Sequence, residues 1–269
     1  MLYNFFDYKG FIEGYKGEDF LGTAHKIFMI LAVLLIIVIC FLCKNLKKEK
    51  MDLYFKVLSI IIPIVEVCKI VWESYWDIKF GYGFNKTGLL PLYTCSMFIY
   101  ALPLAAWCKG KVKDCAVCWL ATIGVFGGLT NFFLPPILNT YPFFHYASFN
   151  SLIFHFLMVL TGLLIVVSGY KKFSWIDGLK GFIPLAAFSV IVIPVDYILK
   201  ADYMLYYNGY GAPILPDLAN TFSQLGLRFI FTIIVFIGYL LIAYLFVSIY
   251  IGIGKLSNYL KNKREIIKE

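Results

Sequence analysis

The amino-acid sequence predicts an all-α, polytopic membrane protein of about seven transmembrane helices, with its amino terminus outside and its carboxyl terminus in the cytoplasm. Of the 269 residues, 61% are hydrophobic and only 15% are charged, whereas soluble domains are about half apolar and a quarter charged. Apolar segments of about twenty residues recur, which is the length that an α-helix needs to cross a bilayer. Because no linker divides the chain, we expect one membrane domain covering residues 1–269.

Seven apolar segments are the expected spans. Only helices and closed barrels satisfy their own backbone hydrogen bonds inside a bilayer, so each segment is expected to be helical. The segments are 27–43, 53–73, 89–108, 115–138, 147–169, 179–199 and 229–253. The first is kept as a span, because the residues before it are acidic and lack the basic start of a signal peptide. The second is interrupted by Pro63, Glu66 and Lys69.

The distribution of basic residues gives the expected orientation. Most of the 24 lysine and arginine residues follow the first, third, fifth and seventh spans, and the alternate segments hold few. The positive-inside rule therefore predicts that these basic segments and the tail 255–269 lie in the cytoplasm. Basic loops beside an anionic leaflet also account for the net charge of +8, and no base-stacking pattern accompanies them. A nucleic-acid partner is not expected.

The seven cysteines do not form a disulfide or metal pattern. All seven lie within expected spans, and five of them, Cys40, Cys43, Cys68, Cys95 and Cys108, are expected to behave there as small apolar groups. Cys115 and Cys118 form a lone C-x-x-C motif, without the second pair that a zinc site needs or the βαβ unit of a thioredoxin. We therefore expect neither a metal nor a cofactor.

Polar residues lie at a common depth in the expected outer half of the membrane. Ionisable groups at this depth normally face the bundle interior or a water-filled cavity. At 1.5 Å per helical residue, Cys95 lies about 9 Å below the start of its span and His155 about 12 Å deep. The other residues expected to support this cavity are Glu66, Lys69, Glu73, Asn131, Ser151, Asp196 and Arg228. The alternative is structural pairing, as in a Glu66–Lys69 pair that neutralises itself.

Two connecting segments on the expected outer side are unusually rich in aromatic residues and glycine. They are 76–88 and 200–226. The longer one is expected either to fold down as a lid or to lie in the membrane interface as an aromatic belt.

Cys95 and His155 are the expected catalytic pair. A thiol in apolar surroundings becomes a nucleophile only if a base takes its proton, and a third group usually orients that base. The expected orienting carboxylate is Glu66, Glu73 or Asp196. The expected donor to a developing oxyanion is Asn131 or Lys69.

Three stretches also resemble a known family. They are LLPLYTC (89–95), YPFFHYASFNSLIFH (141–155) and DYILKADYMLYYNGYGAP (196–213). Over most of the chain, in topology and motif order, the sequence resembles the YwaF-type integral membrane proteins, which are related to the eukaryotic transmembrane protein 164 acyltransferases. The resemblance implies that a membrane cysteine and a later histidine, here Cys95 and His155, move a fatty acyl chain between phospholipids. The sequence departs from the family pattern at Tyr93, where histidine is expected, and near Asp196 and Asp202, where asparagine is expected.

The residues and the resemblance together favour a thiol-dependent lipid acyltransferase of the cell membrane, or a lipid esterase if water is the acceptor. The expected partners are a membrane phospholipid or a lysophospholipid. One alternative is a transporter or permease that binds a solute or ion in the cavity, although no repeated halves with broken helices are visible. Another is a non-catalytic accessory protein in which these residues only pack. The sequence sets no oligomeric state.

Overall fold

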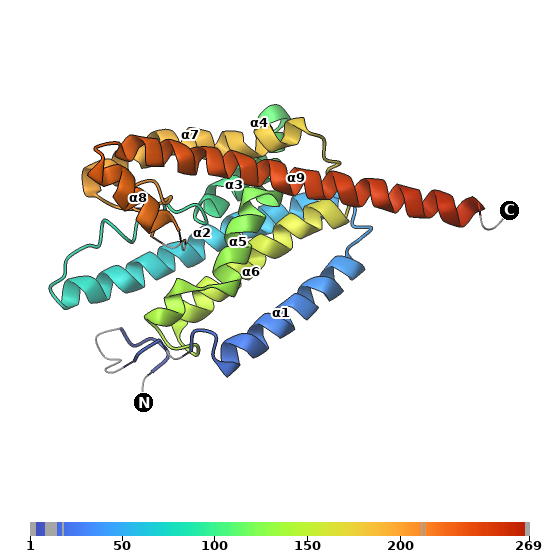
Figure 1. The fold of residues 1–269 in the computed structure, drawn as a ribbon. Coiled ribbons are helices and arrows are strands. Elements are labelled where there is room, and N and C mark those ends of the chain that lie inside the picture. Colours follow the sequence, from blue (N-terminus) through green and yellow to red (C-terminus); the bar gives the residue numbers. More distant parts are fainter. Residues whose placement is uncertain (1–3, 9–14, 18, 211, 213, 267–269) are drawn as a thin grey trace.

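The chain folds into a bundle of α-helices in a computed structural model that describes residues 4–8, 15–17, 19–210, 212 and 214–266. Figure 1 shows the helices and both termini. In order they are α1 (Thr23–Leu42), α2 (Lys48–Lys79), α3 (Met97–Trp107), α4 (Gly110–Ala121), α5 (Ile123–Phe133), the 3-10 turn η2 (Pro136–Asn139), α6 (Tyr146–Val167), α7 (Ile176–Leu199), α8 (Leu215–Gln224) and α9 (Arg228–Ile266).

Within the described residues, five helical segments are long and apolar enough to cross a membrane. They are α1, the segment Gly110–Asn139 that contains α4 and α5, α6, α7 and the part Arg228–Leu260 of α9. A chain with several such segments is a multi-pass membrane protein. The expected second span lies inside α2, which is long enough but carries Glu66, Lys69 and Glu73.

The expected third span is shorter than the sequence suggests. Its helix begins at Met97, so the prediction of a helix from Leu89 is wrong for the first eight residues. Pro91 accounts for part of this difference, because proline lacks an N–H and disfavours helical geometry at the preceding residue. The 11 residues of α3 extend only about 16 Å, at 1.5 Å per residue. Cys95 therefore lies in the irregular segment before α3 and not within a helix.

The expected fourth span, 115–138, is also divided. α4 and α5 meet at Thr122, whose φ of −116° and ψ of −91° are not helical. The Thr122 hydroxyl donates to the Cys118 carbonyl, a side-chain contact that competes with the backbone ladder. Gly162 of α6 packs against this region, since an added Cβ would lie 2.6 Å from the Leu120 carbonyl oxygen. The break and the glycine together bring α6 against α4 and α5.

The connecting segments gather at two opposite ends of the bundle. At one end, Asp52 near the start of α2 accepts from Lys113 of α4 at 2.7 Å and from Tyr170 after α6 at 2.6 Å. Burial alone would raise the pKa of Asp52, but these two hydrogen bonds hold it below its ordinary value. At the other end, the N–H of Tyr146 donates to Phe5. The basic segments after α1, α3 and α6 thus share one end, and their cytoplasmic location stays a prediction.

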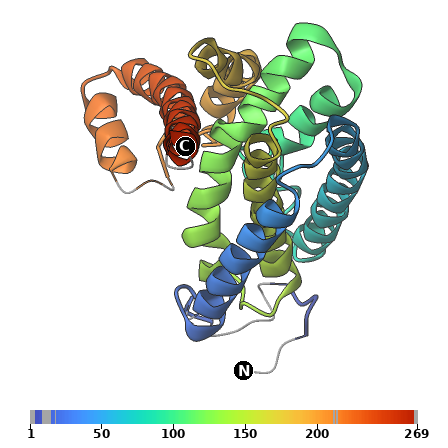
Figure 2. The same cartoon turned by 90° about the vertical axis from the view of Figure 1, so that its right-hand side faces the viewer.

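α5 and α6 form the middle of the bundle. Figure 2 shows α8 and α9 on one side of them and α2 on the other. α1 lies at the edge and packs against α6, with only His25, Ala32 and Ile36 buried. Its exposed apolar side chains suit contact with lipid. The basic tail forms no separate element, because α9 continues through it to Ile266.

The long segment 200–226 packs into the bundle. Tyr203, Met204 and Tyr206 are almost fully buried, and α8 follows them. The Asp202 carboxylate holds the turn by accepting four backbone N–H groups from residues 207–210. Of the two expected arrangements, the lid fits this packing, because an interfacial belt would leave these rings outside the core.

Candidate functional site

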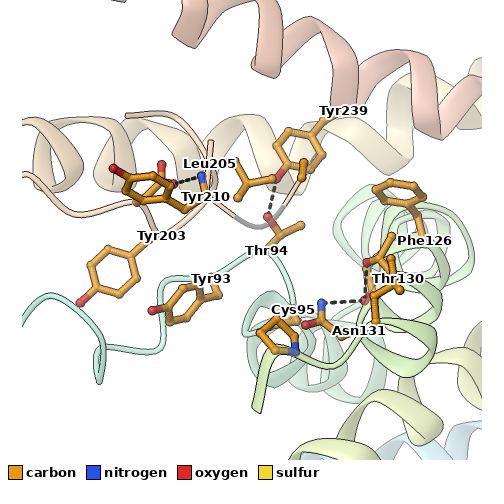
Figure 3. Close-up of a pocket in the computed structure, with 15 residues that line it drawn as sticks. Tyr93, Thr94, Cys95, Phe126, Thr130, Asn131, Tyr203, Leu205, Tyr210 and Tyr239 are labelled. Atoms are coloured by element: carbon orange, nitrogen blue, oxygen red, sulfur yellow. Dashed lines mark hydrogen bonds between the residues drawn. The ribbon is translucent and has the colours of Figure 1, made fainter. Parts of the chain in front are cut away.

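A cavity of about 390 Å³ lies beneath this lid, which is within the size range of small-molecule sites. We call it the Cys95 cavity. Its walls come from the segment before α3, from α5, from the lid and from α9. Figure 3 shows labelled residues of all four walls, among them Cys95, Asn131, Tyr203 and Tyr239. Of the residues that the sequence assigns to a polar cavity, only Cys95 and Asn131 line this one.

Cys95 directly precedes Ser96, the residue that caps the start of α3. The backbone N–H groups of Cys95 and Ser96 both interact with the Cys95 sulfur. The first N–H groups of a helix have no partner within it, and the helix dipole adds positive potential there. The start of α3 therefore adds positive potential beside the sulfur, which partly offsets the burial that disfavours negative charge on the thiol.

His155 is held in α6 with one ring nitrogen free. Its Nδ1 lies 2.7 Å from the backbone carbonyl oxygen of Ser151. Since a carbonyl can only accept, Nδ1 carries the proton, and Nε2 presents its lone pair. His155 is 6% exposed, and among the described residues its buried Nε2 has no hydrogen-bond partner. The group that orients the His155 ring is thus a backbone carbonyl and not one of the expected carboxylates.

The other two of the three histidines are held in the opposite way. His25 Nδ1 accepts from the N–H of Leu21, and its Nε2 lies 3.3 Å from the carbonyl oxygen of Phe132. His145 Nδ1 accepts from the N–H of Ala147, and its Nε2 lies 2.6 Å from the Asp7 carbonyl oxygen. Both nitrogens are engaged in each ring, so His155 alone has a lone pair available as a base.

The Glu66–Lys69 pair acts electrostatically on the expected catalytic pair. The Lys69 ammonium is 2.7 Å from the Glu66 carboxylate, and the Lys69 side chain is 31% exposed. Lys69 acts electrostatically on Cys95 and also on His155. α2 therefore presents one cation to both groups, although His155 does not line the Cys95 cavity.

Asp196 and Arg228 hold the lid and do not enter the cavity, which corrects the prediction that they support it. Asp196 accepts from the N–H of Tyr203 at 2.9 Å. Arg228 donates to the Tyr207 carbonyl and stacks on the Tyr207 ring, with its guanidinium carbon 4.1 Å from the ring centre. Ser151 contributes its carbonyl to His155, and Glu73 acts electrostatically on Tyr93.

Several cavity residues are not among the expected site residues, and of these Tyr93 is named from the sequence only as a departure from the family pattern. Tyr93, Tyr203, Tyr210 and Tyr239 supply much of the lining, and the Tyr239 hydroxyl lies 2.7 Å from that of Thr94. Tyrosine carries no net charge, so it gives no signal of membrane depth. For Tyr203 and Tyr210, the aromatic richness of 200–226 is the available indication.

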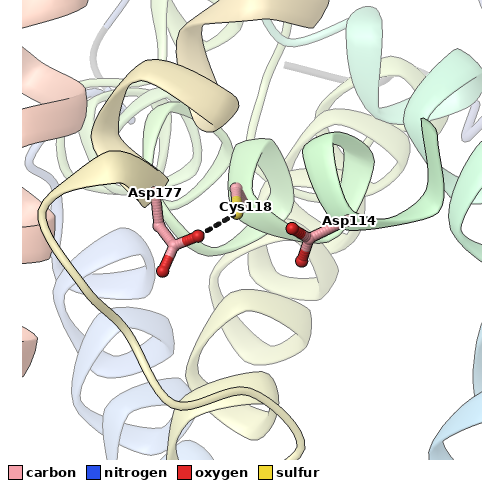
Figure 4. A group of neighbouring side chains, drawn as sticks. All are labelled: Asp114, Cys118 and Asp177. Atoms are coloured by element: carbon pink, nitrogen blue, oxygen red, sulfur yellow. Dashed lines mark hydrogen bonds between the residues drawn. The ribbon is translucent and has the colours of Figure 1, made fainter. Parts of the chain in front are cut away.

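A second polar group lies at the end of the bundle where Asp52 is found. The ligand atoms of Asp114, Cys118 and Asp177 all lie within 4.8 Å of one another, and Figure 4 shows them. Lys171 and Lys180 each contact both carboxylates. Because these ammonium groups already neutralise the carboxylates, the group is an ion-pair cluster that joins α4 to α7 and the segment before it.

Comparison with known proteins supports a family assignment. Neither the curated proteins nor the solved structures include a significant match to the chain. A family profile described as the TMEM164 family matches residues 20–250. This match includes Cys95, His155 and the whole lid. The chain therefore belongs to the TMEM164 family.

Proposed function

We propose that this protein is a YwaF-type member of the TMEM164 family and a membrane-embedded, thiol-dependent lipid acyltransferase. The family is generally linked to acyltransferase activity. One observation carries the proposal: the Cys95 sulfur lies at a cavity wall and at a helix start, while the buried Nε2 of His155 has no partner among the described residues. A nucleophile and an unused base are what acyl transfer through a thioester needs.

The reaction begins when Cys95 attacks the ester carbonyl of a phospholipid. The thiol proton passes to His155 Nε2, directly or through one water, as the sulfur–carbon bond forms. When the tetrahedral intermediate collapses, the ester carbon–oxygen bond breaks and the proton moves from His155 to the departing lysophospholipid oxygen. A second lysophospholipid hydroxyl then gives its proton to His155 and attacks the thioester carbonyl. As this intermediate collapses, the carbon–sulfur bond breaks and His155 returns the proton to the Cys95 sulfur.

The charge of the cavity indicates which part of the lipid enters it. No lysine or arginine lines it within the described residues, and its one carboxylate, Asp202, already accepts four backbone N–H groups. A phosphate there would lack a counter-charge. The ester and adjoining acyl carbons therefore enter, and the phosphate stays outside. A cavity of about 390 Å³ holds only part of a two-chain lipid, so the remainder lies in the bilayer.

The proposal is tested by acyl exchange in vesicles that contain purified protein, a phospholipid with a labelled acyl chain and an unlabelled lysophospholipid. We expect the label to appear in the lysophospholipid, and Cys95→Ser to abolish the exchange, since a hydroxyl is a far weaker nucleophile than a thiol. Cys68→Ser is the matched control, because Cys68 is exposed on α2. Undiminished exchange by Cys95→Ser would refute the proposal.

The fate of the label also separates transfer from hydrolysis. If water were the acceptor, the label would be recovered as free fatty acid even when the lysophospholipid is abundant. In an esterase, Cys95 and His155 would keep the same roles, but water would replace the lysophospholipid as the acyl acceptor. We expect transfer, because a cavity with a largely aromatic and apolar lining excludes water from the thioester.

A further inference from the structure

We infer that Asn131 is the side-chain donor that stabilises the oxyanion formed when Cys95 attacks an ester. This inference rests on the proposed function and adds a catalytic residue to it. Asn131 lies on α5 and, like Cys95, lines the cavity. Figure 3 labels both residues among those that line the cavity.

The Asn131 amide is held in place while part of it stays available. Its Nδ2 donates one hydrogen to the Gly127 carbonyl at 3.2 Å. A side-chain amide has two N–H donors and one carbonyl acceptor. The Asn131 side chain makes no other hydrogen bond within the described residues. The first bond fixes the amide, and the second N–H remains for a ligand, which is the preorganisation that oxyanion stabilisation requires.

The start of α3 supplies a complementary donor. The backbone N–H groups of Cys95 and Ser96 both act on the sulfur, and the main-chain hydrogen bonds of α3 begin with the N–H of Met97. An ester carbon bonded to the sulfur places its oxygen close to these groups. Backbone N–H groups and one asparagine amide together form a common type of oxyanion site.

Two other donors fit this role less well. Lys69 is bound to Glu66 at 2.7 Å and does not line the cavity. Tyr93 lines the cavity, but its hydroxyl has no hydrogen bond within the described residues that would fix its direction. A donor that must first be ordered stabilises a transition state less than one already in place.

Asn131 acts while the tetrahedral intermediate forms and collapses. As the sulfur–carbon bond forms, the carbonyl π bond breaks and its electron pair moves to oxygen. The free Nδ2–H of Asn131 donates to that oxygen while the thiol proton passes to His155. When the ester bond breaks, the carbonyl reforms and the Asn131 hydrogen bond weakens again.

The experiment compares two reactions of the same thiol in purified full-length protein. A p-nitrophenyl acyl ester acylates Cys95 through an oxyanion, whereas an alkyl iodide alkylates it in a direct displacement that forms none. We expect Asn131→Ala to slow acylation about 100-fold, the usual effect of removing one oxyanion donor, and to leave alkylation unchanged. Mass spectrometry of the Cys95 peptide measures both rates.

Thr130→Val is the matched control. The Thr130 hydroxyl also donates to the Gly127 carbonyl, at 3.1 Å, and Thr130 also lines the cavity. The variant removes the same backbone contact but no spare N–H, so its acylation rate should fall far less. An equal fall for both variants would overturn the inference, as would an equal fall of acylation and alkylation in Asn131→Ala.

The outcomes distinguish this inference from the proposed function. If Tyr93→Phe slows acylation and Asn131→Ala does not, the oxyanion donor is Tyr93; acyl transfer by Cys95 stands and the role of Asn131 falls. If the ester fails to acylate Cys95 in the unmodified protein, the acyltransferase proposal fails and this inference falls with it.

Discussion

His155 donates its Nδ1 hydrogen to the backbone carbonyl of Ser151 at 2.7 Å, and this contact leaves Nε2 as the free lone pair. A backbone acceptor has consequences that a carboxylate would not. It cannot be removed by a side-chain substitution, and it brings no second charge into the bundle. The imidazole is thereby oriented by its own helix.

The first prediction follows from this orientation. His155→Gln should lower acyl exchange by about 100-fold or more, the usual contribution of a general base. Ser151→Ala should retain most activity, because the Ser151 hydroxyl lies at 3.5 Å from Nδ1 and the carbonyl acceptor remains. Initial rates of label transfer in vesicles measure both. Equal losses would show that the hydroxyl, not the carbonyl, orients the ring.

The second prediction concerns pH. Burial, only partly opposed by the hydrogen bond to the Asp7 carbonyl, lowers the pKa of His145 below its ordinary value of 6.5. The unfolded chain therefore binds this proton more readily than the fold. The stabilisation is complete above pH 6.5 and is lost as the pH falls below that value.

The physical cause is the cap of α6. A protonated His145 could no longer accept from the N–H of Ala147. Thermal unfolding in detergent should therefore begin at a lower temperature at about pH 5.5 than at about pH 7.5. In His145→Asn, whose amide accepts at both pH values, the difference should shrink. A difference of the same size would assign the pH dependence to other groups.

The third prediction tests the close contact of α6. A methyl group on Gly162 would lie 2.1 Å from Val125 Cγ2 and 2.6 Å from the Leu120 carbonyl oxygen. Gly162→Ala should therefore destabilise the protein by about 1–3 kcal/mol, as overpacking does. Gly238→Ala on α9 is the control, since nothing lies within 4 Å of its added methyl. Equal melting temperatures of the two variants would contradict the packing at Gly162.

The fourth prediction tests the orientation in the membrane. Tyr82 is 70% exposed in the segment after α2, and Ser257 is exposed near the end of α9. In intact cells an impermeant thiol reagent should label Tyr82→Cys but label Ser257→Cys only after permeabilisation. Reversed labelling would invert the orientation and place the Cys95 cavity toward the cytoplasmic leaflet.

The sequence by itself determined the membrane class and most of the helices. Length and apolarity of a segment are local properties, so α1, α6, α7 and most of α9 follow from composition alone. It also singled out Cys95 and His155 as candidate residues, from their chemistry and from a family resemblance. The family itself is confirmed by the match over residues 20–250.

Only the tertiary structure decided what these residues contact. The free Nε2 of His155 is distinguished from the rings of His25 and His145 by contacts to Phe132 and Asp7, more than a hundred residues away. The contacts of Asp196 in α7 and Arg228 in α9 with the lid likewise depend on how the lid folds back onto these helices. The depth of Cys95 calculated for a helix from Leu89 is wrong, because the chain before α3 is not helical. The sequence indicates how deep a residue lies along a helical span. Which residues of other spans it contacts depends on packing between distant segments.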